Sequence, residues 1–175
     1  MNINLKIEQL EAIEEHADEL SELLIRVVED GASIGFLPPL DLTSALRYWN
    51  TVLAPEVILL VALINNQLVG SVQLHLSTKQ NGGFRAEIAK LMTHPDYRRQ
   101  GIGRLLMQNA EERAIQERRS LLILDTREGD PSNLLYASMG YIQAGRIPNY
   151  AKSANGELHA TIFYYKELTS HSLMI

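Results

Sequence analysis

The sequence predicts one α/β domain with a mixed, mostly antiparallel sheet flanked by helices. Two apolar runs, 57–64 and 67–76, are separated only by a pair of asparagines, which is typical of an antiparallel hairpin. The segment 84–92 is followed by a glycine turn and a helical pattern, and then by a continuous apolar run at 121–124. A strand, a crossover helix and a second strand predict one parallel pair within this sheet.

The length and composition fit a single domain over residues 1–175. The chain is 46% apolar and 21% charged, which is ordinary for a globular protein with a full core. The first ten residues lack a basic segment followed by an apolar run, and no stretch approaches 18 consecutive apolar residues. We therefore expect a cytoplasmic protein that does not associate with membranes.

Composition also excludes several classes of chemistry. The chain has no cysteine, which rules out disulfides, thiolate metal sites and a cysteine nucleophile. The five histidines show no metal-ligand spacing, so we expect no metal. The formal net charge of −5 argues against a general nucleic-acid binder.

The N-terminal part is expected to form a short strand and two helices. Alternating apolar residues over 3–7 predict the strand, and apolar residues at helical spacing predict a helix over 10–30 that Gly31 ends. Asp41 is placed to cap a second helix over about 42–53.

The stretch from 84 to 107 organises the rest of the chain. Glu87 lies on one face of a strand that Pro95 ends. A helix then begins at the turn formed by Gly101 and Gly103.

A helix that opens in glycines is a natural anion site. Phosphates can approach the free N–H groups of its first turn, and the helix dipole adds to the attraction. Arg98, Arg99 and Arg104 place further donors around the same point. The predicted ligand is a pyrophosphate, and the alternative is an ordinary helix N-terminus. Neither the P-loop nor the dinucleotide-binding glycine pattern fits, because Leu106 stands where the third glycine of the latter would be.

The C-terminal part should complete the sheet. The run 121–124 is expected to be a parallel strand buried on both faces, so Asp125 follows it into the crevice outside the carboxyl ends of the strands. Further elements are expected as a helix over 131–138 and strands over 141–144 and 159–166. The segment 147–158 between the last two strands is expected to be a polar loop, either a lid or a hairpin connection.

The segment Gly31 to Gly35 formally matches the Gly-x-Ser-x-Gly nucleophile elbow of hydrolases. That elbow needs a strand before it and a helix directly after it. Here a predicted helix precedes it, and Phe36-Leu37-Pro38-Pro39 follows. We interpret the segment as a loop over a site, with Ser33 and Phe36 as candidate substrate contacts.

Two motifs resemble the GNAT superfamily of N-acetyltransferases. Arg98-x-x-Gly101-x-Gly103 resembles the acetyl-CoA loop, and the segment from Tyr136 to Tyr141 resembles the Tyr-x-x-x-Gly-Phe end of the cofactor site. The resemblance implies acetyl-CoA as acetyl donor and a central parallel strand pair splayed at its site. The residues it implies for binding acetyl-CoA are Leu91, Met92, Thr93, Arg98, Arg99, Gln100, Gly101, Ile102, Gly103 and Arg104.

Within the superfamily the chain is similar to the tabtoxin-resistance type of acetyltransferase. The likeness lies in GASIGF, RAEIAKLM, LLILDT and GELHATIFYYKEL, and covers about residues 31–168. It assigns catalytic roles to Glu87 and Asp125. Gly129 departs from the wider superfamily, where an asparagine at this distance before the tyrosine segment contacts pantetheine.

The residue chemistry agrees with these roles. A carboxylate near the acceptor attracts its ammonium form and then accepts a proton, directly or through water. Glu87 and Asp125 can face one crevice if their strands pair in parallel. By resemblance, Tyr136 protonates the departing thiolate. The alternatives are that Glu87 pairs with Arg85 or Lys90, that Asp125 caps a turn, and that Tyr136 packs in the core.

The expected function is direct, acetyl-CoA-dependent acetylation of a small cationic or amino-acid-like amine, with toxins and antibiotics among the candidates. Tyr141 is a further candidate substrate contact. The alternatives are acetylation of a protein or peptide, and a binding module that senses acetyl-CoA without turnover. A monomer and a homodimer both remain open.

Overall fold

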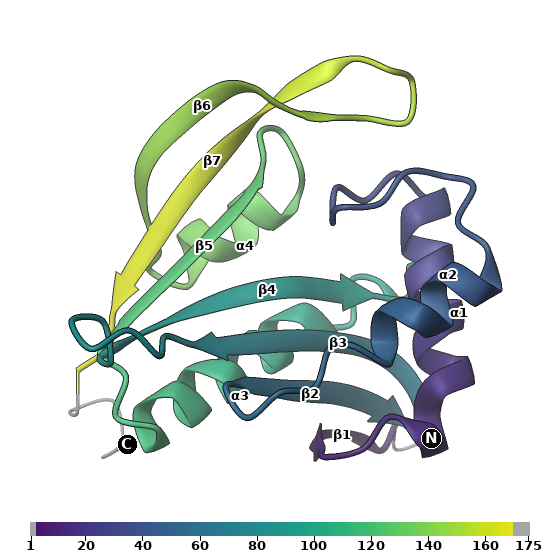
Figure 1. Cartoon of the computed structure of the whole chain (residues 1–175), viewed down its shortest axis with the longest axis horizontal. Helices are drawn as coiled ribbons and strands as arrows, with labels where there is room; N and C mark the ends of the chain where they lie inside the picture. The colour runs from purple at the N-terminus through teal and green to yellow at the C-terminus, as the bar shows by residue number, and fades with distance from the viewer. Residues whose placement is uncertain (1–2, 170–175) are drawn as a thin grey trace.

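The computed structural model describes residues 3–169, which form one seven-stranded sheet with helices packed against it (Figure 1). The strand order is β1-β2-β3-β4-β5-β7-β6. The strands are β1 (Leu5–Leu10), β2 (Val57–Ile64), β3 (Gln67–Leu76), β4 (Arg85–Thr93), β5 (Leu121–Arg127), β6 (Ile142–Lys152) and β7 (Leu158–Glu167). Among the strands of the described residues, only β4 and β5 pair in parallel, which confirms the predicted mixed, mostly antiparallel sheet.

Four α-helices and two short 3₁₀ turns complete the described chain. They are η1 (Glu14–His16), α1 (Ala17–Glu29), α2 (Leu42–Trp49), η2 (Pro95–Tyr97), α3 (Ile102–Gln116) and α4 (Ser132–Ser138). The Asp41 side chain accepts a hydrogen bond from the Ser44 N–H at 2.7 Å and so caps α2, as predicted.

The hairpin between β2 and β3 has the predicted two-residue turn. Asn65 and Asn66 have φ angles of 50° and 67°, in the left-handed region that asparagine tolerates better than most residues. Two consecutive positive φ angles are the signature of the type I′ turn, whose twist matches that of the flanking strands.

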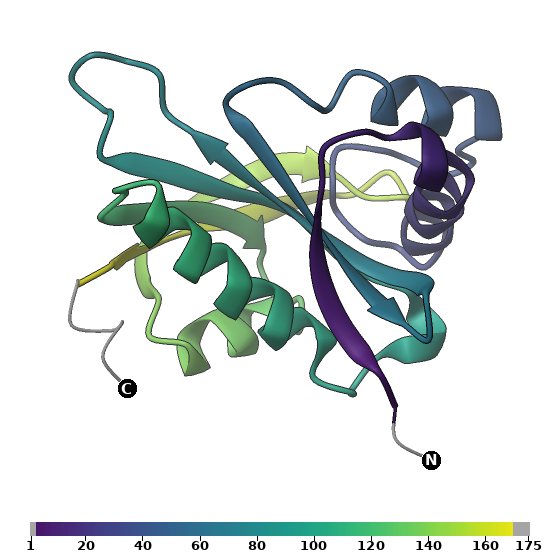
Figure 2. The same ribbon diagram turned by 90° about the horizontal axis from the view of Figure 1, so that it is seen from below.

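The sheet separates two apolar cores. Ile58, Leu60 and Ala62 of β2 pack with α3, whereas the alternate residues Leu59 and Val61 pack with α1 and α2. Figure 2 shows α3 lying across one face of the sheet, with α1 and α2 gathered at one end. Because β2 is covered on both faces, it reads as an unbroken apolar run.

The parallel pair is short. Only Arg85 to Glu87 of β4 pair with Leu121 to Ile123 of β5, and the two strands then separate (Figure 1). Residues 88–93 therefore present an edge that β5 does not cover, and a gap opens in the middle of the sheet.

The predicted helix over 10–30 was wrong at its start. Leu10 ends β1, and α1 begins only at Ala17. Leu10 and Ile13 are nevertheless buried in the same core as α1. The apolar stripe thus continues through a strand end and a 3₁₀ turn, which spacing alone does not distinguish from a helix.

The predicted loop over 147–158 was also wrong. Residues 147–152 belong to β6, Leu158 begins β7, and only residues 153–157 connect the two strands. Pro148 lies where the register between the two strands shifts, on an edge strand that needs no second set of ladder hydrogen bonds. The first half of this segment is therefore part of the sheet and does not form a mobile lid.

The strand β5 is not buried on both faces as predicted. Leu122 and Leu124 are buried, but Ile123 and Asp125 are exposed. The core that includes α1 and α2 takes its sheet residues from β1 to β4, so the same face of β5 stays open.

Candidate active site

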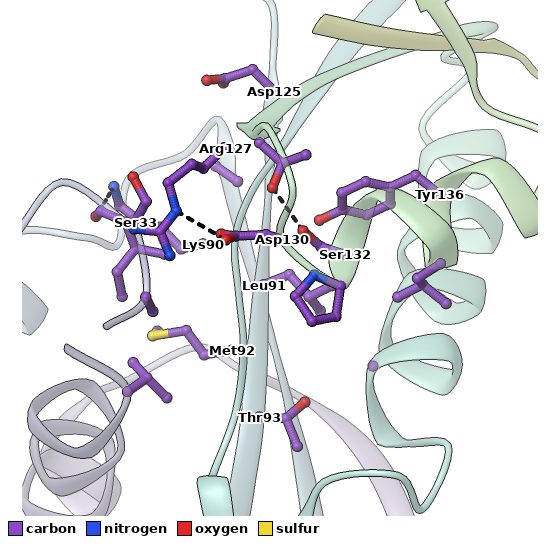
Figure 3. Close-up of a pocket in the computed structure, with 18 of the residues that line it drawn as sticks. Ser33, Lys90, Leu91, Met92, Thr93, Asp125, Arg127, Asp130, Ser132 and Tyr136 are labelled. Carbon is purple, nitrogen blue, oxygen red and sulfur yellow. Dashed lines mark hydrogen bonds and ion pairs between the residues drawn. The ribbon is translucent and has the colours of Figure 1, made fainter. Parts of the chain in front are cut away.

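A cavity of about 1010 Å³ lies where β4 and β5 separate. Its walls come from the loop after α1, the second half of β4, the start of α3, the end of β5, α4 and the β6–β7 hairpin. Glu87 and Asp125 both line it, as does Tyr136. We call this space the main cleft (Figure 3).

Glu87 is held in an environment that disfavours its charge. Desolvation is the largest cause that raises its pKa above 4.5, the charge of Asp125 raises it further, and Lys90 opposes both. The expected alternative of an ion pair is not seen, since no cation lies within 4 Å of Glu87 in the described part of the chain. Its carboxylate is available as a base.

Asp125 is oriented from β7. The Thr161 hydroxyl lies 3.0 Å from both Asp125 Oδ2 and the Thr126 carbonyl oxygen, so its one proton is shared between these two acceptors. The other carboxylate oxygen of Asp125 has no hydrogen-bond partner among residues 3–169. Asp125 also lies inside β5 rather than after its end, because β5 extends to Arg127. The turn-capping alternative is thus replaced by a contact with the neighbouring strand.

Tyr136 combines core packing with a place in the cleft. Its ring lies against Tyr141 and Tyr164, with centroids 5.8 and 5.9 Å away. Burial raises its pKa well above 10, and the charge of Asp125 raises it further, so the phenol keeps its proton. In Figure 3 it points from α4 toward β4.

The predicted glycine turn stands at the start of α3. Gly101 is the N-cap residue with φ 79°, and the first bond inside the helix runs from the Leu105 N–H to the Gly101 carbonyl at 3.0 Å. The N–H groups of the first turn are therefore left for a ligand. A Cβ on Gly103 would meet Leu135 at 3.6 Å and Thr93 at 3.8 Å. The residues of this turn that line the cleft are Arg98, Arg99, Gly101, Ile102, Gly103 and Arg104, without Gln100.

Two of the three arginines have partners on neighbouring elements. Arg98 forms an ion pair with Asp30 at 2.5 Å, and Arg104 donates to the Ser138 hydroxyl at 2.7 Å. Both pairs are exposed, so such partners exchange readily for phosphate oxygens.

The strand β4 carries a bulge beside the cleft. Its register with β3 shifts between the pairs Ser71–Met92 and Gln73–Ala89, and Lys90 has φ 55°. Leu91, Met92 and Thr93 follow the bulge along the edge that β5 leaves open, and all three line the cleft. Figure 3 shows Met92 on the side of α1 and Thr93 on the side of α3.

The three predicted substrate contacts lie in different surroundings. Ser33 lines the cleft in a loop that directly follows the helix α1 rather than a strand, so the nucleophile-elbow context is absent. Phe36 packs edge-on against Tyr48, with centroids 5.1 Å apart, and does not line the main cleft. Tyr141 is 5% exposed and lies in the core, so the structure does not bring it to the cleft.

Sequence reasoning missed two cations that fasten the loop after α1. Lys90 Nζ donates to the Ile34 carbonyl at 2.6 Å, and Arg127 Nη2 donates to the Gly31 carbonyl at 2.9 Å. Arg127 also bonds Asp130 and Ser153, at 2.9 and 3.1 Å. No local pattern marks these contacts, because their partners are 56 and 96 residues away in the sequence.

The described residues contain no group of three or more His, Asp or Glu side chains arranged to hold a metal ion. Among the same residues, no helix is long and apolar enough to cross a membrane.

Known structures share this architecture. An N-acetyltransferase from Staphylococcus aureus Mu50 superposes with a TM-score of 0.81 and 14% identity, covering 95% of this chain and 99% of that one. The ribosomal-protein-alanine N-acetyltransferase from Brucella melitensis gives 0.79 and 21%, covering 93% and 99%. The Salmonella typhimurium protein yncA, solved with its cofactor acetyl-CoA, gives 0.78 and 16%, covering 96% of each chain.

A family model decides the assignment. The model of the acetyltransferase (GNAT) family matches residues 10–141, which is more than half of the chain. The matched region includes β4 with Glu87, the turn at Gly101 and the start of α3, β5 with Asp125, and Tyr136. The chain therefore belongs to the GNAT family of acetyltransferases, which use acetyl-CoA as the acetyl donor.

Proposed function

We propose that this acetyltransferase transfers the acetyl group directly from acetyl-CoA to the amine of a small cationic or amino-acid-like molecule. The observation that carries the proposal is the meeting of Glu87 and Asp125 in one cleft with the anion site at Gly101. Two carboxylates attract an ammonium group, and the absence of cysteine removes a thiol relay from the route.

The donor would bind along β4 and α3. Backbone N–H groups of the first turn of α3, with Arg98, Arg99 and Arg104, would hold the pyrophosphate. The open edge of β4 offers backbone groups to the amide-bearing pantetheine arm, much as a strand edge accepts an added strand. Bound acetyl-CoA supplies an acetyl thioester that is already activated for transfer.

The protein's main tasks are to position the amine and to move protons. A primary amine with a pKa of ~10 is neutral in only about one part in a thousand at pH 7, a penalty of roughly 4 kcal/mol. Glu87, with Asp125 beside it, accepts that proton as the C–N bond forms. A backbone N–H on the open edge of β4 would donate to the developing oxyanion. As the C–S bond breaks, Tyr136 gives its proton to the departing thiolate.

Lys90 supports an amino-acid-like acceptor. Lys90 lines the same cleft as the two carboxylates. Desolvation lowers the pKa of Lys90, and the negative charges of Asp125 and Glu87 partly offset this by raising it. A zwitterion can offer its ammonium to Glu87 and its carboxylate to Lys90. The resemblance to tabtoxin-resistance acetyltransferases supports toxins and antibiotics as candidates within this class.

A protein or peptide acceptor is the second candidate. The Brucella relative is named as a ribosomal-protein-alanine N-acetyltransferase. In addition, one cleft wall is the strand β6 rather than a loop over 147–158 that could close as a lid, so that side of the cleft can stay open to an extended peptide.

The test is incubation with isotope-labelled acetyl-CoA and a mixed pool of amino acids, amino-acid-like toxins, polyamines and peptides, followed by mass spectrometry. A labelled small amine that disappears with Glu87→Gln supports the proposal. Labelled peptides alone would favour the second candidate. Acetyl-CoA binding without any product from the pool would contradict the proposal and favour the sensing module.

A further inference from the structure

A second cavity of about 470 Å³ lies on the α2 side of the sheet. It shares Glu87, Ala89 and Lys90 with the main cleft, so the two spaces meet at β4. Its other walls come from the end of α2, the segment leading to β2, and β3. A molecule whose amine lies at Glu87 therefore has a second space beside it.

The β3 wall of this cavity carries a polar residue, Gln73, at a position where its neighbours in the sheet are buried and apolar. Gln73 pairs with Leu59 of β2, which is buried in the core of α1 and α2. Gln73 itself is only 2% exposed. Burial of an amide at such a position costs free energy that a leucine or methionine would avoid. Packing alone does not account for the residue, and such departures from the expected pattern mark functional sites.

Gln73 is the centre of a hydrogen-bonded row across the cavity. Its Nε2 donates to the Tyr48 hydroxyl at 2.9 Å, and its Oε1 accepts from His75 Nε2 at 2.9 Å. These two bonds leave the Tyr48 O–H proton, the second Gln73 N–H and His75 Nδ1 without partners among the described residues. His75 also lies directly opposite Glu87 across β3 and β4.

The row is uncharged near pH 7. Burial raises the pKa of Tyr48 and lowers the pKa of His75. The charge of Lys90 lowers the His75 pKa further, and the charge of Glu56 opposes this shift without reversing it. A carboxylate in this cavity would face two like charges, Glu87 and Glu56, besides Lys90, and an ammonium would face the like charge of Lys90 besides those two carboxylates. A neutral group that both donates and accepts hydrogen bonds fits the row without either penalty.

We propose that the second cavity is a subsite for the part of the acceptor beyond its reacting amine, and that it selects an uncharged hydrogen-bonding group such as a carboxamide. This inference rests on the proposed function, because it places the amine at Glu87. Tyr48, Gln73 and His75 are then the residues that determine specificity.

The test compares matched primary amines that differ only in their tails. ω-Amino carboxamides, alkylamines of the same length and α,ω-diamines compete for labelled acetyl-CoA, and product ratios are measured. Dissociation constants are also measured with unreactive CoA present, so selectivity is read without turnover. The variants are Gln73→Met and Tyr48→Phe, which remove polar atoms but keep the shape. Gln143→Met on the exposed side of β6 is the matched control.

We expect the wild-type protein to prefer the carboxamide over the alkylamine by at least ~10-fold, as expected for a buried hydrogen-bonding site. The preference should fall toward unity in both cavity variants and persist in Gln143→Met. Equal use of the two tails, a ratio unchanged by the cavity variants, or a preference for diamines would overturn the inference. Selective binding without any acetylation would instead contradict the proposed function and leave the subsite standing.

Discussion

In the proposed mechanism, the chemistry depends most directly on Glu87. It lies half-buried at the point where β4 loses its partner strand, and desolvation raises its pKa from 4.5. The neighbouring Asp125 adds to that shift, while Lys90 limits it. A base whose pKa is raised toward the working pH holds an abstracted proton better than an ordinary carboxylate does.

Removing either carboxylate should impair turnover while donor binding survives. We expect Glu87→Gln to lower kcat by roughly 10²- to 10⁴-fold, the usual contribution of a positioned base, and Asp125→Asn to lower it in the same direction. Acetyl-CoA affinity measured by calorimetry should stay near the wild-type value, since neither residue lies at the α3 turn. Near-normal kcat in a variant would remove that residue from the mechanism.

The same substitution should stabilise the fold. An acid whose pKa is raised by folding binds more protons in the folded state, so ionised Glu87 destabilises the protein above that pKa. Glu87→Gln is therefore expected to raise Tm at pH 7, with the gain vanishing as the pH falls below about 4.5, where both states are protonated. Thermal melts at pH 7 and pH 4 test this. A lower Tm for the variant at pH 7 would contradict the proposed environment.

At the scale of single elements, we expect the turn before α3 to control the binding of acetyl-CoA. Gly101 has φ 79°, a conformation that costs other residues about 1–2 kcal/mol. Its position at the N-cap sets the direction of the first-turn N–H groups. A change there should alter the anion site more than the rest of the fold.

Gly101→Val should weaken acetyl-CoA binding by at least ~10-fold, because a β-branched residue resists the left-handed region and moves the turn. Gly83→Val is the control, since no atom lies within 4 Å of a Cβ there and its φ is not positive. Calorimetric titration with acetyl-CoA measures both. Unchanged affinity in Gly101→Val would undo the pyrophosphate assignment.

The loop after α1 should depend on Arg127, which links it to the turns at Asp130 and Ser153. Arg127→Met keeps the stem but loses all three bonds. We expect faster amide hydrogen exchange over residues 31–35 and a higher KM for the acceptor, with acetyl-CoA affinity little changed. Arg127→Lys is the charge-matched control and should recover part of the effect. Exchange as slow as in the wild type would show that the loop is held by other contacts.

At the scale of the whole molecule, the order of elements followed from patterns that are local in the sequence. A few neighbouring residues are enough to predict three of these features: the hairpin at Asn65, the cap at Asp41 and the strand–glycine–helix unit at Gly101. The β6 strand could not be predicted in this way, because its Pro148 and polar residues are tolerated only through pairing with β7. Likewise, one face of β5 is exposed because α1 and α2 cover that side of the sheet only over β1 to β4.

The candidate site was predictable only in part for the same reason. Glu87 and Asp125 could be brought together from the expected parallel pairing, and the structure places both in the main cleft. The roles of Lys90 and Arg127 could not be seen, because each acts through a carbonyl group far away in the chain. Gln73 looked like one member of an apolar run until its hydrogen bonds and burial were known.

The most direct test of the account is the pH dependence of kcat/KM in the wild type, Glu87→Gln and Asp125→Asn. The wild type should lose activity on the acid side with an apparent pKa above 4.5, as Glu87 takes up a proton. Asp125→Asn should shift this limb to lower pH, since it removes a charge that raises the Glu87 pKa. Glu87→Gln should lack the limb. An acid limb that persists in Glu87→Gln would contradict the assignment of Glu87 as the base.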